Sequence, residues 1–308
     1  MASEAATVAD PPPRERRTTL QDVLEVRELF TEELKLPMEL VDQILDMGEF
    51  WPSSQARTSQ SYAVMQRHSD VPGFDGNLLV LRTGIVGKCT HPDQDALPPQ
   101  TWSENNRPSP PAHPNEALCT GAAFRTALGP EMPLLLRPVR KIVFTICSHD
   151  QGWSSNYREP ENEYAGSYTW FEVGLERFAQ GDDEQINDIH NLADTRTVIP
   201  KALIDGDVTR LDLGRHSIPD DNLIQKNRHA NRKTTEHCIE WRWDDDIEPD
   251  TKRATTELQQ KGRGLTTGTG KFVRSLQAGD IITVWAKARF PGWRNEVESV
   301  AVDVYWAF

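Results

Sequence analysis

Two short stretches of the chain combine tryptophan with glycine and several polar side chains. They are SHDQGW at residues 148–153 and FPGWRN at residues 290–295. An indole ring offers a flat apolar face, and Asp, Gln, Asn and Arg side chains fix the orientation of a bound molecule. This combination suits a sugar or a peptide. The residues that we expect to contact such a ligand come from these stretches and the strands beside them: Asp150, Gln151, Trp153, Tyr168, Trp170, Arg289, Trp293 and Asn295.

A structural role is the other interpretation of the two stretches. A Gly-Trp pair at a strand end often closes the end of a β-sandwich, and Asp or Asn at such a place accepts hydrogen bonds from turn amides. The observation that bears on both interpretations is whether the two stretches lie at the same end of the fold.

Three other patterns do not fit a catalytic, phosphate-binding or metal site. Ser148, His149 and Asp150 are consecutive, whereas the members of a catalytic triad come from separate segments. The glycine-rich residues 261–271 lack two features of a Walker loop, a glycine five residues before its Gly-Lys pair and a Ser or Thr after the lysine. The histidines show neither HxH nor HExxH spacing, and His237 is expected to be a buried, hydrogen-bonded histidine. We therefore expect no catalytic residue, metal or cofactor.

The composition bears on the class of partner. The 308-residue chain has a formal net charge of −13, whereas a binder of the nucleic-acid backbone needs a basic surface. No apolar run approaches the roughly 20 residues that span a bilayer. We therefore expect neither a nucleic-acid nor a membrane partner.

The N-terminus and the cysteines predict the compartment. The first 17 residues carry no hydrophobic segment of a secretory signal, and the four cysteines form no CxxC pair. These features predict reduced thiols in a cytoplasmic or nuclear protein.

Strands must position the two tryptophan stretches. Five segments alternate apolar and polar residues with the period of two that a strand produces. In the first of them, Ile142, Phe144 and Ile146 share the apolar face. Strands with one apolar and one mixed face predict a mainly β fold, an antiparallel jelly-roll-like sandwich from about residue 75 to the C-terminus. The five segments are residues 141–149, 167–177, 236–244, 280–290 and 297–306.

The remaining segments are predicted as a tail, a helical hairpin and an insertion. Residues 1–17 are expected to be disordered. Residues 18–52 carry apolar residues at helical spacing, with Thr19 as the N-cap and Pro37 opening a second helix, and this hairpin is expected to pack on the sandwich. Residues 91–133 form a Pro-rich insertion with one short helix.

The stretch LPMELVDQILD at residues 36–46 resembles the start of an F-box, in which an LP-x-E-L helix contacts an adaptor of a ubiquitin ligase. An F-box continues with further helices, whereas this chain continues with FWPSSQARTSQ and its companion helix comes first. A hairpin that only packs within the protein is therefore the competing interpretation. The resemblance implies partner-binding residues at Leu36, Pro37, Leu40 and Ile44.

Four motifs, SHDQGW, GSYTWFEVGLER, GDIITVWAKARFPGWRN and VDVYW, resemble a set found in mostly fungal, largely uncharacterised proteins. That family has no known reaction to carry over. In fold pattern the chain is also similar to galactose-binding-like jelly rolls, including sugar-binding F-box-associated domains, which end on Trp-rich strands with a Gly-Trp turn. A shared fold does not by itself give a function.

Together these patterns favour a non-enzymatic binding module for a protein or carbohydrate ligand. The alternative is an F-box-like substrate receptor of a ubiquitin ligase. An enzyme comes third, since it needs a catalytic pair that only the fold brings together.

Overall fold

The computed structural model describes residues 17–58, 60–67, 73–88, 107–128, 135–155, 159–180, 192–206, 208–214 and 221–307. The chain divides into two units, Met1–Pro52 and Ser53–Phe308, and each is described by itself. The predicted disordered tail, apart from Arg17, and the first part of the Pro-rich insertion lie outside the described residues.

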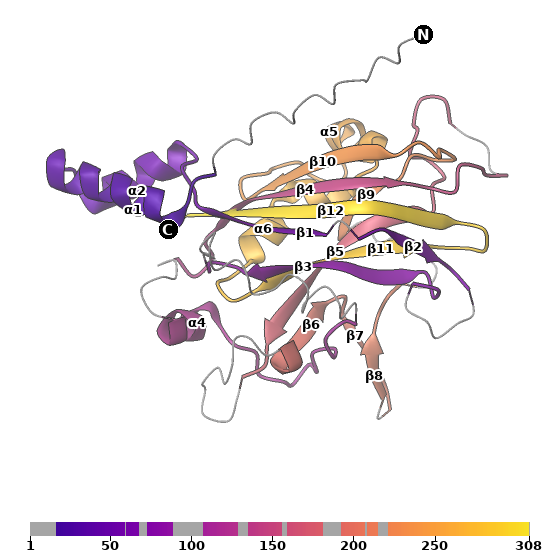
Figure 1. Cartoon of the computed structure of the whole chain (residues 1–308), viewed down its shortest axis with the longest axis horizontal. Helices are drawn as coiled ribbons and strands as arrows, with labels where there is room; N and C mark the ends of the chain where they lie inside the picture. Colours follow the sequence, from indigo (N-terminus) through magenta and orange to yellow (C-terminus); the bar gives the residue numbers. More distant parts are fainter. Residues whose placement is uncertain are drawn as a thin grey trace, which may run out of the picture. The chain divides into compact units, whose positions relative to one another are not determined.

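Two antiparallel sheets form the second unit (Figure 1). In the first sheet the order is β1-β12-β4-β10, and β2 also pairs with β12. In the second sheet the order is β3-β11-β5-β6, and β9 also pairs with β5. From β2 to β5, and again from β10 to β12, successive strands change sheet. This alternation is jelly-roll-like, so the predicted mainly β, antiparallel sandwich is confirmed.

The strand bounds follow the sequence pattern closely for the five predicted strands, β4, β5, β10, β11 and β12. The first sheet contains β1 (Ser53–Thr58), β2 (Tyr62–Met65), β4 (Val139–His149), β10 (Thr235–Arg242) and β12 (Arg294–Trp306). The second contains β3 (Asn77–Ile85), β5 (Thr169–Phe178), β6 (Thr195–Ile199), β9 (Leu223–Lys226) and β11 (Ile281–Ala288). A separate two-stranded sheet pairs β7 (Ala202–Asp205) with β8 (Val208–Leu211).

One cluster of buried apolar side chains joins the two sheets. Ile142 and Phe144 of β4 belong to it together with Phe171 and Val173 of β5, and all four are almost completely buried. Each such side chain stabilises the fold by about 1.5–3 kcal/mol relative to leaving it exposed. The predicted apolar faces of these strands therefore form the core between the sheets.

The sandwich begins earlier than residue 75. Strands β1 and β2 lie in the polar stretch after residue 52, where no strand pattern is visible. Strand β1, with the sequence SSQART, is an edge strand that pairs with β12 from Ser53↔Tyr305 to Thr58↔Val300. Its pairing depends on backbone groups, and Gln55 and Arg57 are exposed, so an apolar alternation is not needed there.

The second sheet is buried on both faces. The predicted mixed face of β5 and β11 carries Trp170, Glu176 and Trp285, and all of them are buried. Part of its cover is residues 107–109, where the Arg107 carbonyl accepts a hydrogen bond from Arg82 and the Ser109 amide donates to Glu176. The mixed character of this face therefore reflects buried polar pairs, not contact with water.

The short helices of the second unit lie in its connections. They are α4 (Gly121–Leu128), which falls in the predicted insertion helix, α5 (Lys252–Glu257) and α6 (Lys271–Ser275). The glycine-rich residues 261–271 form a 3-10 segment at Leu265–Thr269 followed by the start of α6, and Gly268 is buried within it. This stretch is therefore a packed turn.

The first unit contains two helices joined by a π-helical turn. Helix α1 (Leu20–Glu28) begins at Thr19, whose side chain accepts a hydrogen bond from the Asp22 amide, as the N-cap prediction required. The π-turn covers Leu29–Glu33, and α2 (Met38–Met47) follows Pro37. An ion pair of 2.9 Å between Arg27 and Asp42 joins the two helices.

His237 of β10 is a buried histidine whose pKa links the stability of the fold to pH. Its Nε2 atom lies 3.2 Å from the Tyr164 hydroxyl. Burial, assisted by the positive charge of Arg228, lowers the pKa of His237 from 6.5 to about 4. Between these values the unfolded chain binds a proton that the folded chain does not, so the free energy of unfolding falls as the pH falls from about 6.5 to 4.

We predict that His237→Gln removes this part of the pH dependence. Between pH 7 and pH 5, the free energy of unfolding of wild type is expected to fall by about 2 kcal/mol more than that of the variant. Urea unfolding at the two pH values measures both losses. Equal losses for the two proteins would contradict the prediction.

Candidate functional site

The two tryptophan stretches lie side by side at one end of the sandwich. Strand β4 ends at His149, which pairs with Glu296 near the start of β12. The Arg294 amide donates a hydrogen bond of 3.1 Å to the side-chain oxygen of Gln151. A Cβ atom at Gly292 would lie 3.4 Å from the ring of Trp153. The two stretches therefore share one end, which we call the aromatic end.

Four aromatic residues at the aromatic end differ in exposure. Trp153 is 59% exposed and Phe290 is 42% exposed, whereas Trp293 is only 8% exposed. Tyr168, which is half-buried, lies with its ring centroid 4.7 Å from that of Phe290 and 5.2 Å from that of Trp293. On its other side, Trp293 packs against the buried ring of His229 at 5.6 Å. Trp293 therefore closes the end of the fold, and Trp153 and Phe290 face water.

Asp150 has a structural position. It is fully buried, and its carboxylate accepts backbone hydrogen bonds from Gly152 (2.7 Å), Ala230 (2.6 Å) and Asn231 (2.9 Å). Burial raises the pKa of Asp150, and these three amide donors oppose that rise. The side chain therefore holds the turn after β4 against the turn before β10.

Glycine is required at position 152 of this turn. Gly152 has a φ of +84°, and a Cβ atom there would lie 2.7 Å from the Cβ atom of Arg232. This close approach and the carboxylate of Asp150 fix the backbone immediately before Trp153.

Asn295 also lies away from the surface. Its amide nitrogen donates to the backbone carbonyls of Trp170 (3.1 Å) and Lys287 (3.2 Å), and its oxygen accepts from Asn227 (2.9 Å). Because Asn295 belongs to β12 and its partners belong to the other sheet or the turn after β9, it joins the two layers. It fixes the start of β12 and so the position of the PGW turn.

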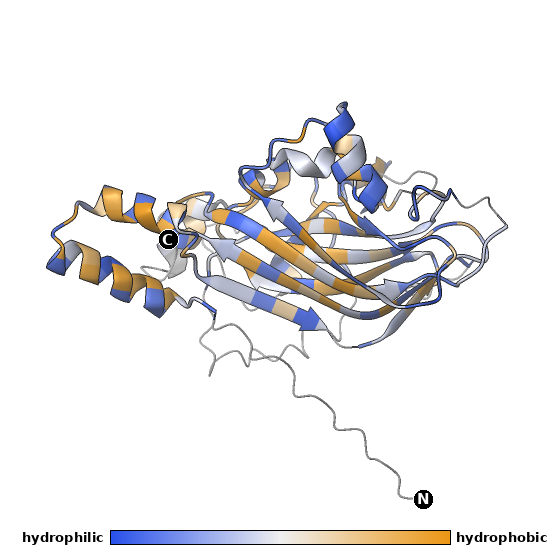
Figure 2. Cartoon of the chain, turned by 90° about the horizontal axis from the view of Figure 1, so that it is seen from above, coloured by the Kyte–Doolittle hydropathy of each residue, from blue (hydrophilic) through white to orange (hydrophobic). Residues whose placement is uncertain are grey.

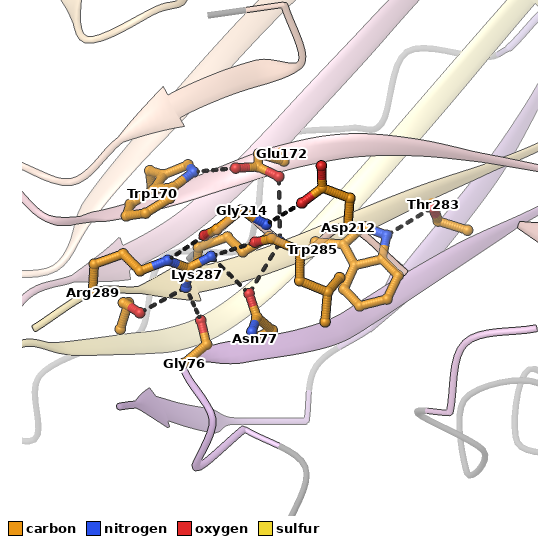
Figure 3. Close-up of polar contacts among 12 residues, drawn as sticks. Gly76, Asn77, Trp170, Glu172, Asp212, Gly214, Thr283, Trp285, Lys287 and Arg289 are labelled. Carbon is orange, nitrogen blue, oxygen red and sulfur yellow. Dashed lines mark hydrogen bonds and ion pairs between the residues drawn. The ribbon is translucent and has the colours of Figure 1, made fainter. Parts of the chain in front are cut away.

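Trp170 and Arg289 belong to a different place, a buried polar cluster on the outer face of the second sheet (Figure 3). The Trp170 indole donates a hydrogen bond of 2.6 Å to Glu172, and the Arg289 guanidinium lies 5.1 Å from the centre of its ring. Arg289 also donates to the carbonyls of Gly76 and Gly214, both at 2.8 Å. Both predicted ligand residues are thus occupied within the fold.

Lys287 lies at the centre of this polar cluster and is 1% exposed. Its ammonium contacts the Glu172 carboxylate at 3.4 Å, the Asn77 side chain at 3.1 Å and the Leu213 carbonyl at 3.3 Å. Burial lowers the pKa of Lys287, and the Glu172 carboxylate opposes that effect. A buried lysine with a lowered pKa can act as a nucleophile, but three partners already satisfy this ammonium, which indicates a structural role.

The residues implied by the F-box resemblance lie in the first unit. Pro37, Leu40 and Ile44 are exposed and Leu36 is half-buried. Exposed apolar side chains on α2 are compatible with a protein contact, with or without a ligase adaptor.

Phe290 is exposed and belongs to the second tryptophan stretch, FPGWRN. It was not among the expected ligand residues. Its φ is 68°, a left-handed conformation that is rare for a bulky residue. Its amide donates a hydrogen bond of 2.7 Å to Gln66. The signal in the sequence is its place in the Phe-Pro-Gly turn, but exposure of the ring is a property of the fold.

Within the described ranges, no group of three or more His, Cys, Asp or Glu side chains is arranged to hold a metal ion. Among the helices that the structure describes, none has the length and apolar character needed to cross a membrane.

No family model, curated protein or solved structure matches this chain. The resemblance of the four motifs to a fungal family therefore stays a prediction.

The two tryptophans of the aromatic end should respond differently to truncation. Trp293→Ala is expected to lower the free energy of unfolding by about 3–5 kcal/mol, because it opens a cavity against Tyr168 and His229. Trp153→Ala should change it by no more than about 0.5 kcal/mol, because its ring is mostly exposed. Urea unfolding of the two variants measures the difference, and similar losses would show that Trp153 also packs in the fold.

Substitutions in the buried ion pair of Lys287 and Glu172 should have coupled effects on the free energy of unfolding. Lys287→Met leaves the Glu172 carboxylate buried without its cation and is expected to destabilise the protein by about 3–5 kcal/mol. Adding Glu172→Gln, which keeps an acceptor for the Trp170 indole, should recover most of that loss. Lys252→Met at the exposed start of α5 is the matched control. Chemical unfolding of wild type, the single variants Lys287→Met and Glu172→Gln and the double variant gives the coupling energy, and additive losses would contradict the assignment.

Proposed function

We propose that this protein is a non-enzymatic binding module whose ligand is a carbohydrate that stacks on Trp153. The observation that carries the proposal is the 59% exposure of this indole on a turn whose backbone is fixed. An apolar ring of this size in water is unfavourable, and burying it against a ligand removes that cost.

The turn is organised before any ligand arrives. Asp150 anchors it through three amides, and Gln151 holds it from both sides, accepting from the Arg294 amide and donating 2.7 Å to the Trp153 carbonyl. A rigid presentation lowers the entropy that binding must remove. The Trp153 ring is therefore offered on a fixed support.

The chemistry around the ring suits a sugar. A pyranose has an apolar face of C–H groups, which covers an aromatic ring, and a rim of hydroxyl groups, which needs hydrogen-bond partners. The exposed side chains of Arg232, in the turn before β10, and Arg294, at the start of β12, belong to segments that adjoin the turn of Trp153 and can supply donors. A peptide is the other ligand that such a platform suits.

A glycan array probed with the full chain tests this proposal. Wild type is expected to bind a defined subset of glycans, and Trp153→Ala should weaken that binding about thirtyfold, the effect of losing about 2 kcal/mol at a central aromatic contact. Trp243→Ala is the matched control, because Trp243 is also a partly exposed tryptophan, located just after β10. Absence of glycan binding by wild type, or an equal loss in the control, would overturn the proposal.

A further inference from the structure

The helical unit exposes many large apolar side chains. Met47 is 86% exposed, and the remaining members of the set are between 38% and 58% exposed. Figure 2 shows apolar residues along both helices of this unit. A concentration of this kind within two short helices is typical of an interaction surface. The set consists of Leu24, Leu29, Leu34, Met38, Leu40, Ile44 and Met47, and we call it the hairpin face.

Helix α2 separates its buried apolar residues from its exposed ones. Val41 and Leu45, one turn apart, are buried. Leu40, Ile44 and Met47 follow the i, i+4, i+7 spacing of a second stripe, and all three are exposed. Of these five apolar residues, only Val41 and Leu45 are buried. The second stripe therefore remains available to a partner.

The charge around the hairpin face is strongly negative. Over residues 20–50 the only basic residues are Arg27 and Lys35. Arg27 is buried and paired with Asp42, and Lys35 lies 3.5 Å from Glu32. The nine acidic residues of the same segment are Asp22, Glu25, Glu28, Glu32, Glu33, Glu39, Asp42, Asp46 and Glu49.

We propose that the hairpin face binds a basic amphipathic helix of another protein. Its apolar stripe matches the apolar face of such a helix, which inserts residues at i, i+3, i+4 and i+7. Its carboxylates match lysines and arginines on either side of that stripe. Met38 and Met47 add flexible side chains that adapt to the shape of a partner.

Charge disfavours two other occupants. A second copy would bring the carboxylates of one hairpin against those of the other, and the repulsion opposes a symmetric contact. A bilayer with anionic lipids would repel the same carboxylates. A cationic partner is the occupant that satisfies both the apolar and the acidic character of the face.

Fluorescence anisotropy with the full chain tests the proposal. The probe is a labelled synthetic peptide of Leu and Lys arranged with helical spacing, compared with a scrambled peptide of the same composition. Wild type should bind the amphipathic peptide at least tenfold more tightly than the scrambled one, and added salt should weaken the binding.

Two pairs of substitutions locate the contact. Leu40→Ser with Ile44→Ser should weaken peptide binding at least tenfold, and thermal unfolding should stay near that of wild type because both side chains are exposed. Leu203→Ser with Ile204→Ser is the matched control, because it removes two exposed apolar side chains from β7, and it should leave peptide binding unchanged.

Three results would overturn the proposal. One is peptide binding that is insensitive to the Leu40 and Ile44 changes. Another is concentration-dependent dimerisation of wild type that the same changes abolish, since it would assign the face to a second copy. The third is binding of a ubiquitin-ligase adaptor without binding of the basic peptide, which would support the F-box-like alternative.

Discussion

The antiparallel pairing of β4 with β12 is the constraint on which the rest of the second unit depends. It runs from His149↔Glu296 to Val139↔Trp306 through the centre of the first sheet. The pairing turns Phe144 and Val302 toward the same core, because opposed residues on paired strands share a face. It also sets the turn after β4 beside the turn before β12. The aromatic end is thus a consequence of this pairing, whose register shifts between Val297 and Ser299. In the stretch from Ser299 to Tyr305, a further slip by one residue would move the core side chains to the outer face.

The second sheet adds a different constraint, since both of its faces are buried. Polar side chains on its outer face must find partners inside the protein, because an unpaired buried charge costs several kcal/mol (about 3–5). Glu176 meets this requirement through Arg82 at 2.8 Å, and Glu172 meets it through Lys287 and Trp170. These pairs connect β5 to β3 and β11, so the polar side chains of this face help to fix the order of the strands.

The sequence was sufficient to predict five strands of the sandwich, and it was insufficient to predict which aromatic residues of the site are exposed. Alternation identified β4, β5, β10, β11 and β12, because each of them has one apolar face and one face with polar side chains, whether that second face meets water or, as in β5 and β11, buried partners. It missed β1, whose sequence SSQART shows no alternation of large apolar residues. Trp153 and Trp293 carry the same local signal, yet one is exposed and the other closes the fold. What separates them is contact with Tyr168 and His229, and such contacts between distant segments leave no trace in local spacing.

Phe290 supports the proposal that the aromatic end binds a ligand. A left-handed backbone costs a residue with a side chain about 1–2 kcal/mol, and this residue has a φ of 68°. Burial of the ring would offset that cost, but the ring is 42% exposed. The edge contact with Tyr168 and the hydrogen bond to Gln66 hold the conformation without hiding the aromatic surface. Strain held in place by the surrounding structure is a feature of functional sites, and here it accompanies Trp153 at the same end of the sandwich.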